Sequence, residues 1–425
     1  MSDHKQPRML FYGAMVNLMY CAAQACKASG LPVEYLIEEP DAFPAHHPFW
    51  LDVCHQFTEE DAEHFSSSAD RFLARVGWSP PDFVRSEQSF DAGAFPRRTA
   101  LSPIRQYIYD NWYSQERVAR LCSAFQGYDA IIVCGSNAVI EAYLSGKPYV
   151  IFVYGADLRL YLGADPRPRA LRDRISYEMY RSILRDAYDR ADAIVSNPPL
   201  SIYASGAKNI TRSKKEFHHD RTTDIVFPVA EATESCDVDI SLPPSKISIL
   251  IPSRVDFYWK GQDMFLRALS RSPHKNKFHV CLLQWGSNQR EASLLVDELQ
   301  LHDTVKFLPF FATRPLLLAL YDRFDLIVDE FYIGTYGTAA LEAMSRSKPV
   351  VTYIDRKMFP NEDQIPPCLS PHSEDEILRM LEQICNGEIN LKELGQAARE
   401  WQQRQGSASA FSGNLLSIVR GVLGA

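Results

Sequence analysis

The chain has 425 residues, of which 46% are hydrophobic and 23% are charged, and its net charge is −8 at pH 7. This length predicts two or three domains, and this composition is typical of a globular protein rather than a disordered one. The negative charge and the lack of a long basic tract argue against a dedicated nucleic-acid binder, so we expect no nucleic-acid partner.

The nine cysteines are scattered along the chain and never form a C-x-x-C pair. We therefore expect reduced thiols, no disulfide framework and no zinc site. The amino terminus lacks the apolar stretch of a signal peptide. No window approaches the ~20 apolar residues that a membrane-spanning helix needs. The sequence thus predicts a cytoplasmic protein.

The first half of the chain begins with a strand, a glycine turn, a helix and a second strand. The apolar run 9–12 ends at Gly13, and helical spacing of apolar residues continues to Gly30. Such a βαβ unit builds a parallel sheet. The pattern is lost from Pro40 to about Pro103, a segment rich in Pro, Phe, Trp and acidic residues, which we interpret as an insertion.

Alternation of strands and helices resumes at residue 130 and gives way to a polar linker, "AEATESCDVDISLPPS". A second alternating series follows, with predicted strands in "KISILIPSR", "FHVCLLQWG", "TVKFLPF", "DLIVD" and "PVVTYI". The fold class is therefore α/β, with two consecutive Rossmann-like domains. We expect the domains at 1–228, with the insertion 40–103, and at 246–402. The linker covers 229–245, and a helix in 403–425 crosses back to the first domain.

The turn "IGTYGT" lies after the predicted strand "LIVD", at a carboxyl end, where open α/β sheets bind ligands. The helix that starts near Thr338 points free N–H groups and its positive dipole end at this place, so a phosphate is the natural guest. Glu342, about one turn into that helix, can accept hydrogen bonds from the hydroxyls of a ribose. The alternative is that Glu342 is a surface residue and the glycines only turn the chain.

Two cations follow the first strand of the second domain. Arg254 lies just past strand 247–251, and Lys260 comes six residues later. Arginine can bind a diphosphate by bidentate hydrogen bonds and lysine as a point charge. Each of them alone is typical of a solvated surface.

Together with "YGTAALEAM" and "KPVV", these cations resemble the donor half of retaining GT-B glycosyltransferases of the family 4 (group 1) type. The resemblance covers about 150 residues and implies a GT-B fold, with two Rossmann-like domains facing each other across a cleft. It also implies a donor site, which in this sequence comprises Arg254, Lys260, Gly334, Thr335, Tyr336, Gly337, Thr338 and Glu342. The sequence departs from the family at the first position of its E-x7-E motif, where Gly334 replaces a carboxylate. Whether Asp329 or Glu330 compensates stays open.

In the first half, "PYVIFVYGADLRL" resembles a family strand that ends in His-Gly-x-Asp. Gly155 and Asp157 match, and Tyr154 replaces the histidine, so Asp157 and Tyr154 are the catalytic candidates. Tyr154 either hydrogen-bonds the sugar or packs, and Asp157 is alternatively a helix N-cap. Gly13 matches the family's glycine loop beside donor and acceptor, and Asn17 is either a polar contact there or a structural residue.

The resemblance implies a hexosyltransferase that moves a sugar from a nucleotide-diphosphate donor to a hydroxyl acceptor with retention, without metal or other cofactor. The acceptor is a saccharide, a lipid-linked saccharide or another hydroxyl compound, as in bacterial-type polysaccharide, glycolipid or glycoconjugate synthesis. The alternatives are a catalytically silent GT-B protein that binds a nucleotide or a partner, and, less favoured, an epimerase or phosphorylase. We expect acceptor specificity in the aromatic insertion, which contains Trp50 and Trp78.

A stretch of mixed charge in the first half leaves open whether the protein contacts a membrane. Seven arginines lie between Arg167 and Arg190 among four acidic residues, and Lys208, Arg212, Lys214 and Lys215 follow. Such mixing is typical of a solvated helix face, and the alternative is peripheral contact with an anionic membrane. The sequence does not indicate the oligomeric state.

Overall fold

The computed structural model describes residues 6–13, 17–38, 44–90, 103, 115–153, 170–196, 222–229, 236–308, 311–359 and 361–424. The chain divides into two compact units, each of which is described by itself. The first comprises Met1–Pro48, Ser79–Pro228 and Ala408–Ala425, and the second comprises Phe49–Trp78 and Val229–Ser407.

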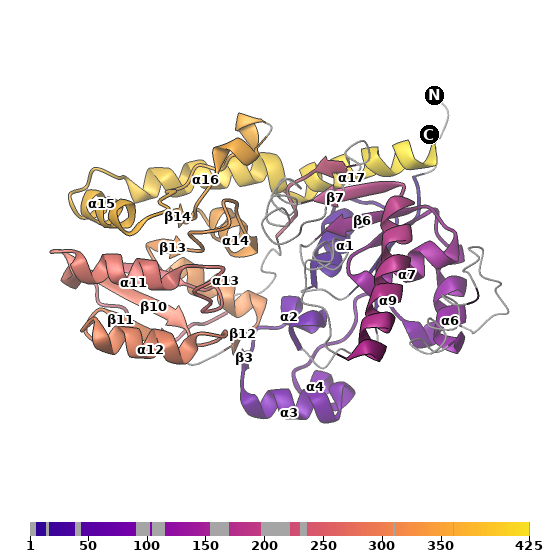
Figure 1. Cartoon of the computed structure of the whole chain (residues 1–425), viewed down its shortest axis with the longest axis horizontal. Helices are drawn as coiled ribbons and strands as arrows, with labels where there is room; N and C mark the ends of the chain where they lie inside the picture. The colour runs from indigo at the N-terminus through magenta and orange to yellow at the C-terminus, as the bar shows by residue number, and fades with distance from the viewer. Residues whose placement is uncertain are drawn as a thin grey trace. The chain divides into compact units, whose positions relative to one another are not determined.

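A seven-stranded sheet with the order β4-β2-β1-β5-β6-β7-β8 forms the centre of the first unit (Figure 1). Each neighbouring pair of strands is parallel, as the βαβ pattern predicts. The strands are β1 (Met9–Tyr12), β2 (Val33–Ile37), β4 (Val84–Ser86), β5 (Ala130–Val133), β6 (Tyr149–Val153), β7 (Ala193–Ser196) and β8 (Thr222–Asp224).

Helices cover both faces of this sheet. Because side chains alternate along a strand, Leu10 and Tyr12 of β1 point into a core shared with α6, α7 and α9. On the other face, Phe152 of β6 contacts Phe411 of α17, with ring centroids 6.0 Å apart. The last helix thus belongs to the unit that the start of the chain forms. The helices are α1 (Leu18–Ala28), α6 (Gln115–Gln126), α7 (Ser136–Ser145), α9 (Leu171–Asp189) and α17 (Ala408–Leu423).

The second unit is built around a five-stranded parallel sheet with the order β11-β10-β9-β13-β14. Its strands are β9 (Ile247–Ile251), β10 (Phe278–Leu283), β11 (Val305–Leu308), β13 (Leu326–Val328) and β14 (Val350–Val351). Its helices are α11 (Gln262–Arg271), α12 (Gln289–Glu298), α13 (Arg314–Arg323), α14 (Thr338–Ser345), α15 (Glu374–Cys385) and α16 (Leu391–Gly406). Each of the five predicted strands is present.

The segment Phe49–Trp78 folds with the second unit, although it lies between stretches of the first in sequence. It contains α2 (Phe49–Asp52), β3 (Gln56–Phe57), α3 (Glu59–Ser67) and α4 (Ala69–Arg75). Strand β3 pairs antiparallel with β12 (Phe311–Ala312). Its aromatic side chains pack on one another and are buried: Phe49, Trp50, Phe57, Phe65 and Phe72.

The expectation that all cysteines are reduced is wrong in this structure. Cys54 and Cys236 form a disulfide, with their Cα atoms 6.0 Å apart. The two cysteines are 182 positions apart in sequence. They meet because the segment Phe49–Trp78 folds with the second unit, and no local spacing reveals such a contact. The other seven cysteines form no disulfide among the described residues.

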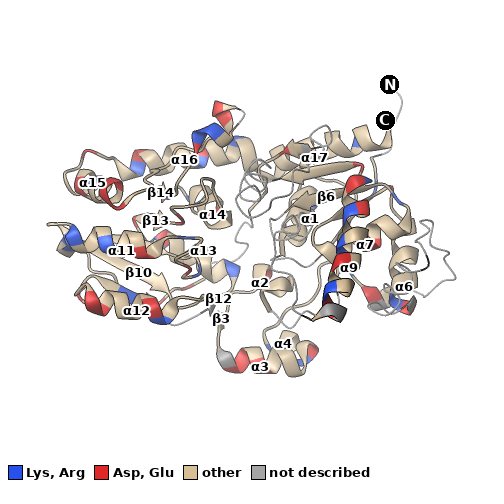
Figure 2. Ribbon diagram, in the orientation of Figure 1, with Lys and Arg blue, Asp and Glu red and all other residues tan. Residues whose placement is uncertain are grey.

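Helix α9 carries acidic and basic side chains along its length, as Figure 2 shows. Arg181 forms an ion pair with Glu178 at 3.1 Å, which fits a helix face with internal charge pairs. The predicted basic loop with Lys208, Arg212, Lys214 and Lys215 lies outside the described residues. Among the described helices, none has the length and apolarity needed to cross a membrane.

Candidate functional site

The strand order of the second sheet places a ligand position between two strands. From β9 the chain proceeds to β10 and β11 on one side, and β13 and β14 then lie on the other side. Ligands bind beyond the carboxyl ends of strands at such a reversal. The loop after β9 carries Arg254 and Lys260, and the turn after β13 carries Asp329 and Glu330. The fold therefore brings the two predicted cations to one edge of the sheet.

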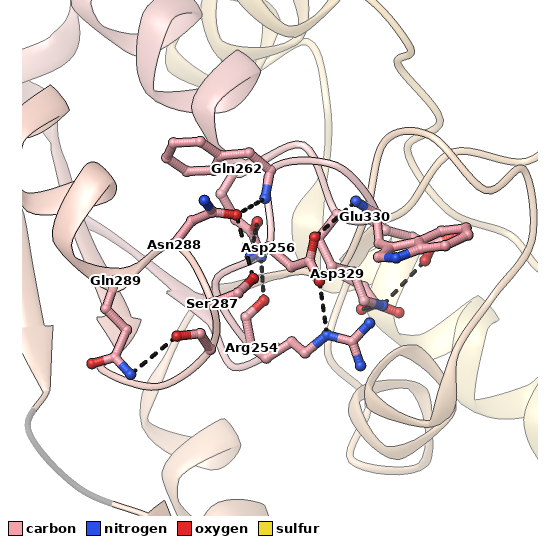
Figure 3. Close-up of polar contacts among 12 residues, drawn as sticks. Arg254, Asp256, Gln262, Ser287, Asn288, Gln289, Asp329 and Glu330 are labelled. Atoms are coloured by element: carbon pink, nitrogen blue, oxygen red, sulfur yellow. Dashed lines mark hydrogen bonds and ion pairs between the residues drawn. The ribbon is translucent and has the colours of Figure 1, made fainter. Parts of the chain in front are cut away.

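The loop after β9 is held in shape by side-chain amides, as Figure 3 shows. The Asp256 backbone N–H donates to Gln262 Oε1 at 3.1 Å, and Gln262 Nε2 donates to the Arg254 carbonyl at 2.8 Å. The Phe257 N–H donates to Asn288 Oδ1 at 3.1 Å. The backbone of this loop is thus fixed before any ligand arrives.

Arg254 keeps most of its hydrogen-bonding capacity open. Its Nε donates to Asp256 Oδ2 at 3.2 Å, and 48% of its side chain is exposed. Its two Nη groups make no hydrogen bond to the described residues. Because the planar guanidinium is anchored on one side only, its outer edge can receive an anion.

Lys260 lies deeper and already has acidic partners. Its Nζ donates to Asp329 Oδ1 at 2.8 Å and to Glu330 Oε2 at 3.1 Å, and only 16% of its side chain is exposed. Burial lowers the pKa of Lys260, but the two carboxylates outweigh burial and hold the pKa above its usual value. Lys260 is therefore a permanent cation. Of the three donors of its ammonium group, one has no partner among the described residues.

The pKa values of Asp329 and Glu330 are shifted in opposite directions, although both residues are buried. Burial disfavours the charge on Asp329, but Lys260 and the Ser253 hydroxyl, 2.6 Å from Oδ1, keep its pKa below the usual value. Burial raises the pKa of Glu330 to about 7, against the opposing effect of Lys260. Both carboxylates therefore bind Lys260 in this structure.

The tip of helix α14 lies against the same carboxylates. Gly337 is the residue before the helix, and a Cβ added there would lie 2.9 Å from Asp329 Oδ2. Gly334 has φ +87°, a backbone conformation that favours glycine. Glycine at these two positions therefore has a local structural cause.

The other predicted residues of this turn differ in their placement. Thr335 is buried, and its Oγ1 has no hydrogen-bond partner in the described part of the chain. The Tyr336 ring packs on Phe359 and Trp401, with centroids 5.9 and 5.4 Å away. That ring belongs to the core of the unit, so Tyr336 contributes its backbone to the turn. Thr338 is the first residue of α14 and is exposed.

Glu342 is buried and paired, rather than exposed on a helix surface. Its Oε2 accepts from Arg314 Nη1 at 2.8 Å and from the Tyr321 hydroxyl at 3.3 Å. Burial raises its pKa above the usual value, against the effect of Arg314. Within the described residues Oε1 accepts no hydrogen bond. One oxygen of the carboxylate is therefore available to a ligand hydroxyl.

In the first unit, the structure gives Gly13 and Asn17 structural roles. Gly13 has φ +116°, and a Cβ there would lie 2.0 Å from the Cys134 carbonyl oxygen, so only glycine fits. Asn17 is buried, and its Nδ2 donates to the Ala45 and His47 carbonyls at 2.7 and 3.0 Å. The predicted residues Tyr154, Gly155 and Asp157 lie outside the described residues.

A buried charge network in the first unit was missed by reasoning from sequence. Arg117 donates to Glu87 Oε1 and to Glu141 Oε1 at 2.8 and 2.9 Å, and the Tyr12 hydroxyl donates to Glu141 Oε2 at 2.8 Å. The signal for Glu141 was a carboxylate within an apolar helix, "NAVIEAYL", the same signal that pointed to Glu342. Its partners come from distant stretches of sequence and have no local signal.

Comparison with known proteins gives one family match, over the second unit. Residues 238–401 match the family model described as glycosyl transferases group 1. This stretch contains Arg254, Lys260, Asp329, Glu330 and Glu342. No curated protein matches the chain by sequence.

Several solved structures are similar to the whole chain. Sucrose-phosphate synthase from Thermosynechococcus elongatus has 16% identity and a TM-score of 0.58, covering 99% of this chain and 100% of that chain. HepE of Anabaena in complex with UDP and glucose has 14% identity and a TM-score of 0.57, covering 98% and 100%. The lipopolysaccharide outer core galactosyltransferase WaaB has 12% identity and a TM-score of 0.53, covering 97% and 99%. These similarities confirm the predicted fold class, GT-B with two Rossmann-like α/β units.

Proposed function

We propose that this chain is a glycosyltransferase that transfers a sugar from a nucleotide-diphosphate donor to a hydroxyl acceptor. One observation carries the proposal. The predicted cations Arg254 and Lys260 lie in the loop at the carboxyl end of β9, and Lys260 contacts the residues that follow β13, all within the residues that match glycosyl transferases group 1. The fold of the solved relatives supports it.

In this proposal the diphosphate binds between Arg254 and Lys260. Arg254 presents its open guanidinium edge, and Lys260 offers the ammonium donor that Asp329 and Glu330 do not use. The cations are fixed beforehand, by Asp256 and by the two buried acids. Preorganised charges of this kind stabilise the negative charge that develops on a leaving diphosphate, without reorganisation during the reaction.

Glu342 is the proposed contact for the ribose of the donor. Its Oε2 is held by Arg314 and Tyr321, so the position of the carboxylate is set. Its Oε1 accepts no hydrogen bond from the described residues and can accept one from a ribose hydroxyl. The single open oxygen predicts a modest contribution to affinity, about that of one hydrogen bond to a charged group, roughly 1.5–3 kcal/mol.

The finer features of the reaction also belong to this proposal. We propose retention of anomeric configuration, transfer without a metal ion, and a saccharide, lipid-linked saccharide or other hydroxyl acceptor in glycan or glycoconjugate synthesis. The similarity to HepE, which was solved with UDP and glucose, makes a UDP-sugar the first donor to test. Product analysis by NMR of the anomeric proton, with and without EDTA, tests retention and metal independence.

The first experiment is a thermal-unfolding screen with UDP, GDP, dTDP, CMP and ADP. A ligand that binds only the folded chain stabilises it by about 2.7 kcal/mol at a hundredfold excess over its dissociation constant. We expect one nucleoside diphosphate to stabilise the wild type and to lose this effect in Arg254→Ala, which should fold because Arg254 is half exposed. Lys392→Ala, an exposed lysine at the start of α16, is the control that retains the effect.

Two other outcomes decide against parts of the proposal. If no nucleotide stabilises the chain, donor binding is excluded and the transferase proposal fails. If a nucleotide binds but the matching sugar donors are neither transferred nor hydrolysed, a silent nucleotide-binding GT-B protein is the better description.

A further inference from the structure

Thr313 links the segment Phe49–Trp78 to the start of helix α13, beside the candidate donor site. Thr313 lies between β12 and α13 and is fully buried. A threonine before a helix usually accepts a hydrogen bond from the first turn of that helix. The Thr313 side chain makes no such bond.

The hydroxyl of Thr313 instead forms hydrogen bonds with the backbone of His55. His55 N–H donates to Thr313 Oγ1 at 2.8 Å, and Thr313 Oγ1 donates to the His55 carbonyl at 2.9 Å. The Thr313 N–H donates to the same carbonyl at 3.2 Å. These three bonds continue the antiparallel pairing of β3 with β12 up to Thr313, the residue before α13.

His55 is itself held firmly by the segment. Its Nε2 lies 2.9 Å from Asp61 Oδ2, and its ring packs edge-on against Phe57 and Phe72. Asp61 also accepts from the Thr58 backbone in a capping box and pairs with Arg75. Helix α2 packs on α13 as well. The segment is therefore held together internally and packs against the start of α13.

The residue after Thr313 is the partner of Glu342. Arg314 is the first residue of α13, and its Nη1 donates to Glu342 Oε2 at 2.8 Å. Tyr321, two turns later in α13, donates to the same oxygen. The position and tilt of α13 thus decide where both donors meet the carboxylate.

We propose that Thr313 is a positioning residue, which through His55 lets the segment Phe49–Trp78 set the geometry of the Arg314–Glu342 pair. This inference rests on the proposed function, because it takes Glu342 as a donor contact. It assigns the segment to nucleotide binding, whereas the sequence pointed to acceptor specificity. The burial of the segment's aromatic rings in the second unit supports this assignment.

The test measures UDP affinity by calorimetry in the full chain, with Thr313→Val and Thr313→Ser. Valine keeps the shape and removes the hydroxyl, so we expect UDP affinity to fall about threefold to tenfold, the effect of one hydrogen bond. Serine keeps the hydroxyl and should restore wild-type affinity. Thr304→Val, a buried threonine next to β11, is the matched control and should leave UDP affinity unchanged.

A double-mutant cycle with Arg314→Gln separates positioning from a general loss of stability. If Thr313 acts through Arg314, the double variant binds UDP no more weakly than Arg314→Gln alone. Additive losses, or a Thr313→Val variant with wild-type affinity, overturn the proposal. Should Thr313→Val fail to fold, Asp61→Asn loosens His55 from the other side and must lower UDP affinity in the same direction. A wild type that binds none of the five nucleotides would instead refute the proposed function itself.

Discussion

Glu330 is a buried acid whose partner is a permanent cation, yet the pKa of its carboxyl group is raised. Burial raises its pKa to about 7, from 4.5 for an exposed glutamate. Lys260 opposes this shift, and the neighbouring negative charge of Asp329 adds to it. At neutral pH the carboxyl of Glu330 is therefore divided between its two protonation states.

This pKa predicts how stability changes with pH. Between pH 4.5 and 7 the folded chain keeps a proton on Glu330 that the unfolded chain has released, so the free energy of unfolding falls as pH rises. The expected loss from this residue is on the order of 3 kcal/mol. Asp329, with its lowered pKa, acts in the opposite direction, but at lower pH.

The measurement is denaturant unfolding at several pH values, for the wild type and Glu330→Gln. We expect the wild type to lose stability relative to the variant as pH rises from 5 to 8. Glu141, whose pKa burial raises to about 8, titrates in both proteins and cancels in the comparison. A constant difference across this range would contradict a titrating Glu330.

At the scale of elements, α7 and α14 show the same arrangement in the two units. Each carries a buried glutamate six residues before Lys-Pro: Glu141 before Lys147, and Glu342 before Lys348. Each glutamate is bonded by an arginine and a tyrosine. In α7 both carboxylate oxygens accept hydrogen bonds, whereas in α14 only Oε2 accepts any from the part of the chain that the structure describes. A buried Glu–Arg–Tyr group is thus a structural device of both units, and the open Oε1 distinguishes Glu342.

Packing of α16 against α14 predicts opposite effects for two helix glycines. A Cβ added at Gly395 in α16 would lie 2.1 Å from the Ser347 carbonyl oxygen, next to the end of α14, whereas one added at Gly413 in α17 meets nothing within 4 Å. Gly395→Ala should therefore destabilise the chain by about 1–3 kcal/mol through overpacking. Gly413→Ala should stabilise it by about 0.5–1 kcal/mol through helix propensity. Thermal unfolding of both variants checks this, and shifts of equal sign would contradict the packing.

For the molecule as a whole, the disulfide between Cys54 and Cys236 predicts how many cysteines react with a thiol reagent before and after reduction. Seven of the nine cysteines should react with a thiol reagent in denaturant without reductant, and all nine after reduction. Replacing Cys54 and Cys236 by serine should lower the free energy of unfolding by about 2–4 kcal/mol, because the unfolded chain loses a long cross-link. Nine reactive thiols before reduction would show that the bond is absent.

The sequence predicted the fold well because its signals are local. Short apolar runs, glycine turns and helical spacing predicted the elements of both sheets, and strand ends placed Arg254 and Lys260 at one edge. The partners of those residues could not be read in this way. Those contacts join residues that are far apart in sequence: Lys260 pairs with Asp329 and Glu330, Arg314 pairs with Glu342, and Cys54 is bonded to Cys236. The packing of the segment Phe49–Trp78 on the second unit could not be predicted for the same reason. Aromatic content indicates that residues are buried, but it does not indicate which part of the chain they pack against.

The division of the chain has a consequence for how it folds during synthesis. Domains generally fold as the ribosome releases them, the amino-terminal one first. Here the first unit lacks α17, which covers one face of its sheet, until residues 408–423 have been made. The segment Phe49–Trp78 emerges long before β12, so its aromatic side chains must wait for more than half of the chain to appear. The core of the first unit is therefore complete only after residues 408–423 have emerged, and the core of the second only after the segment Phe49–Trp78 has met β12.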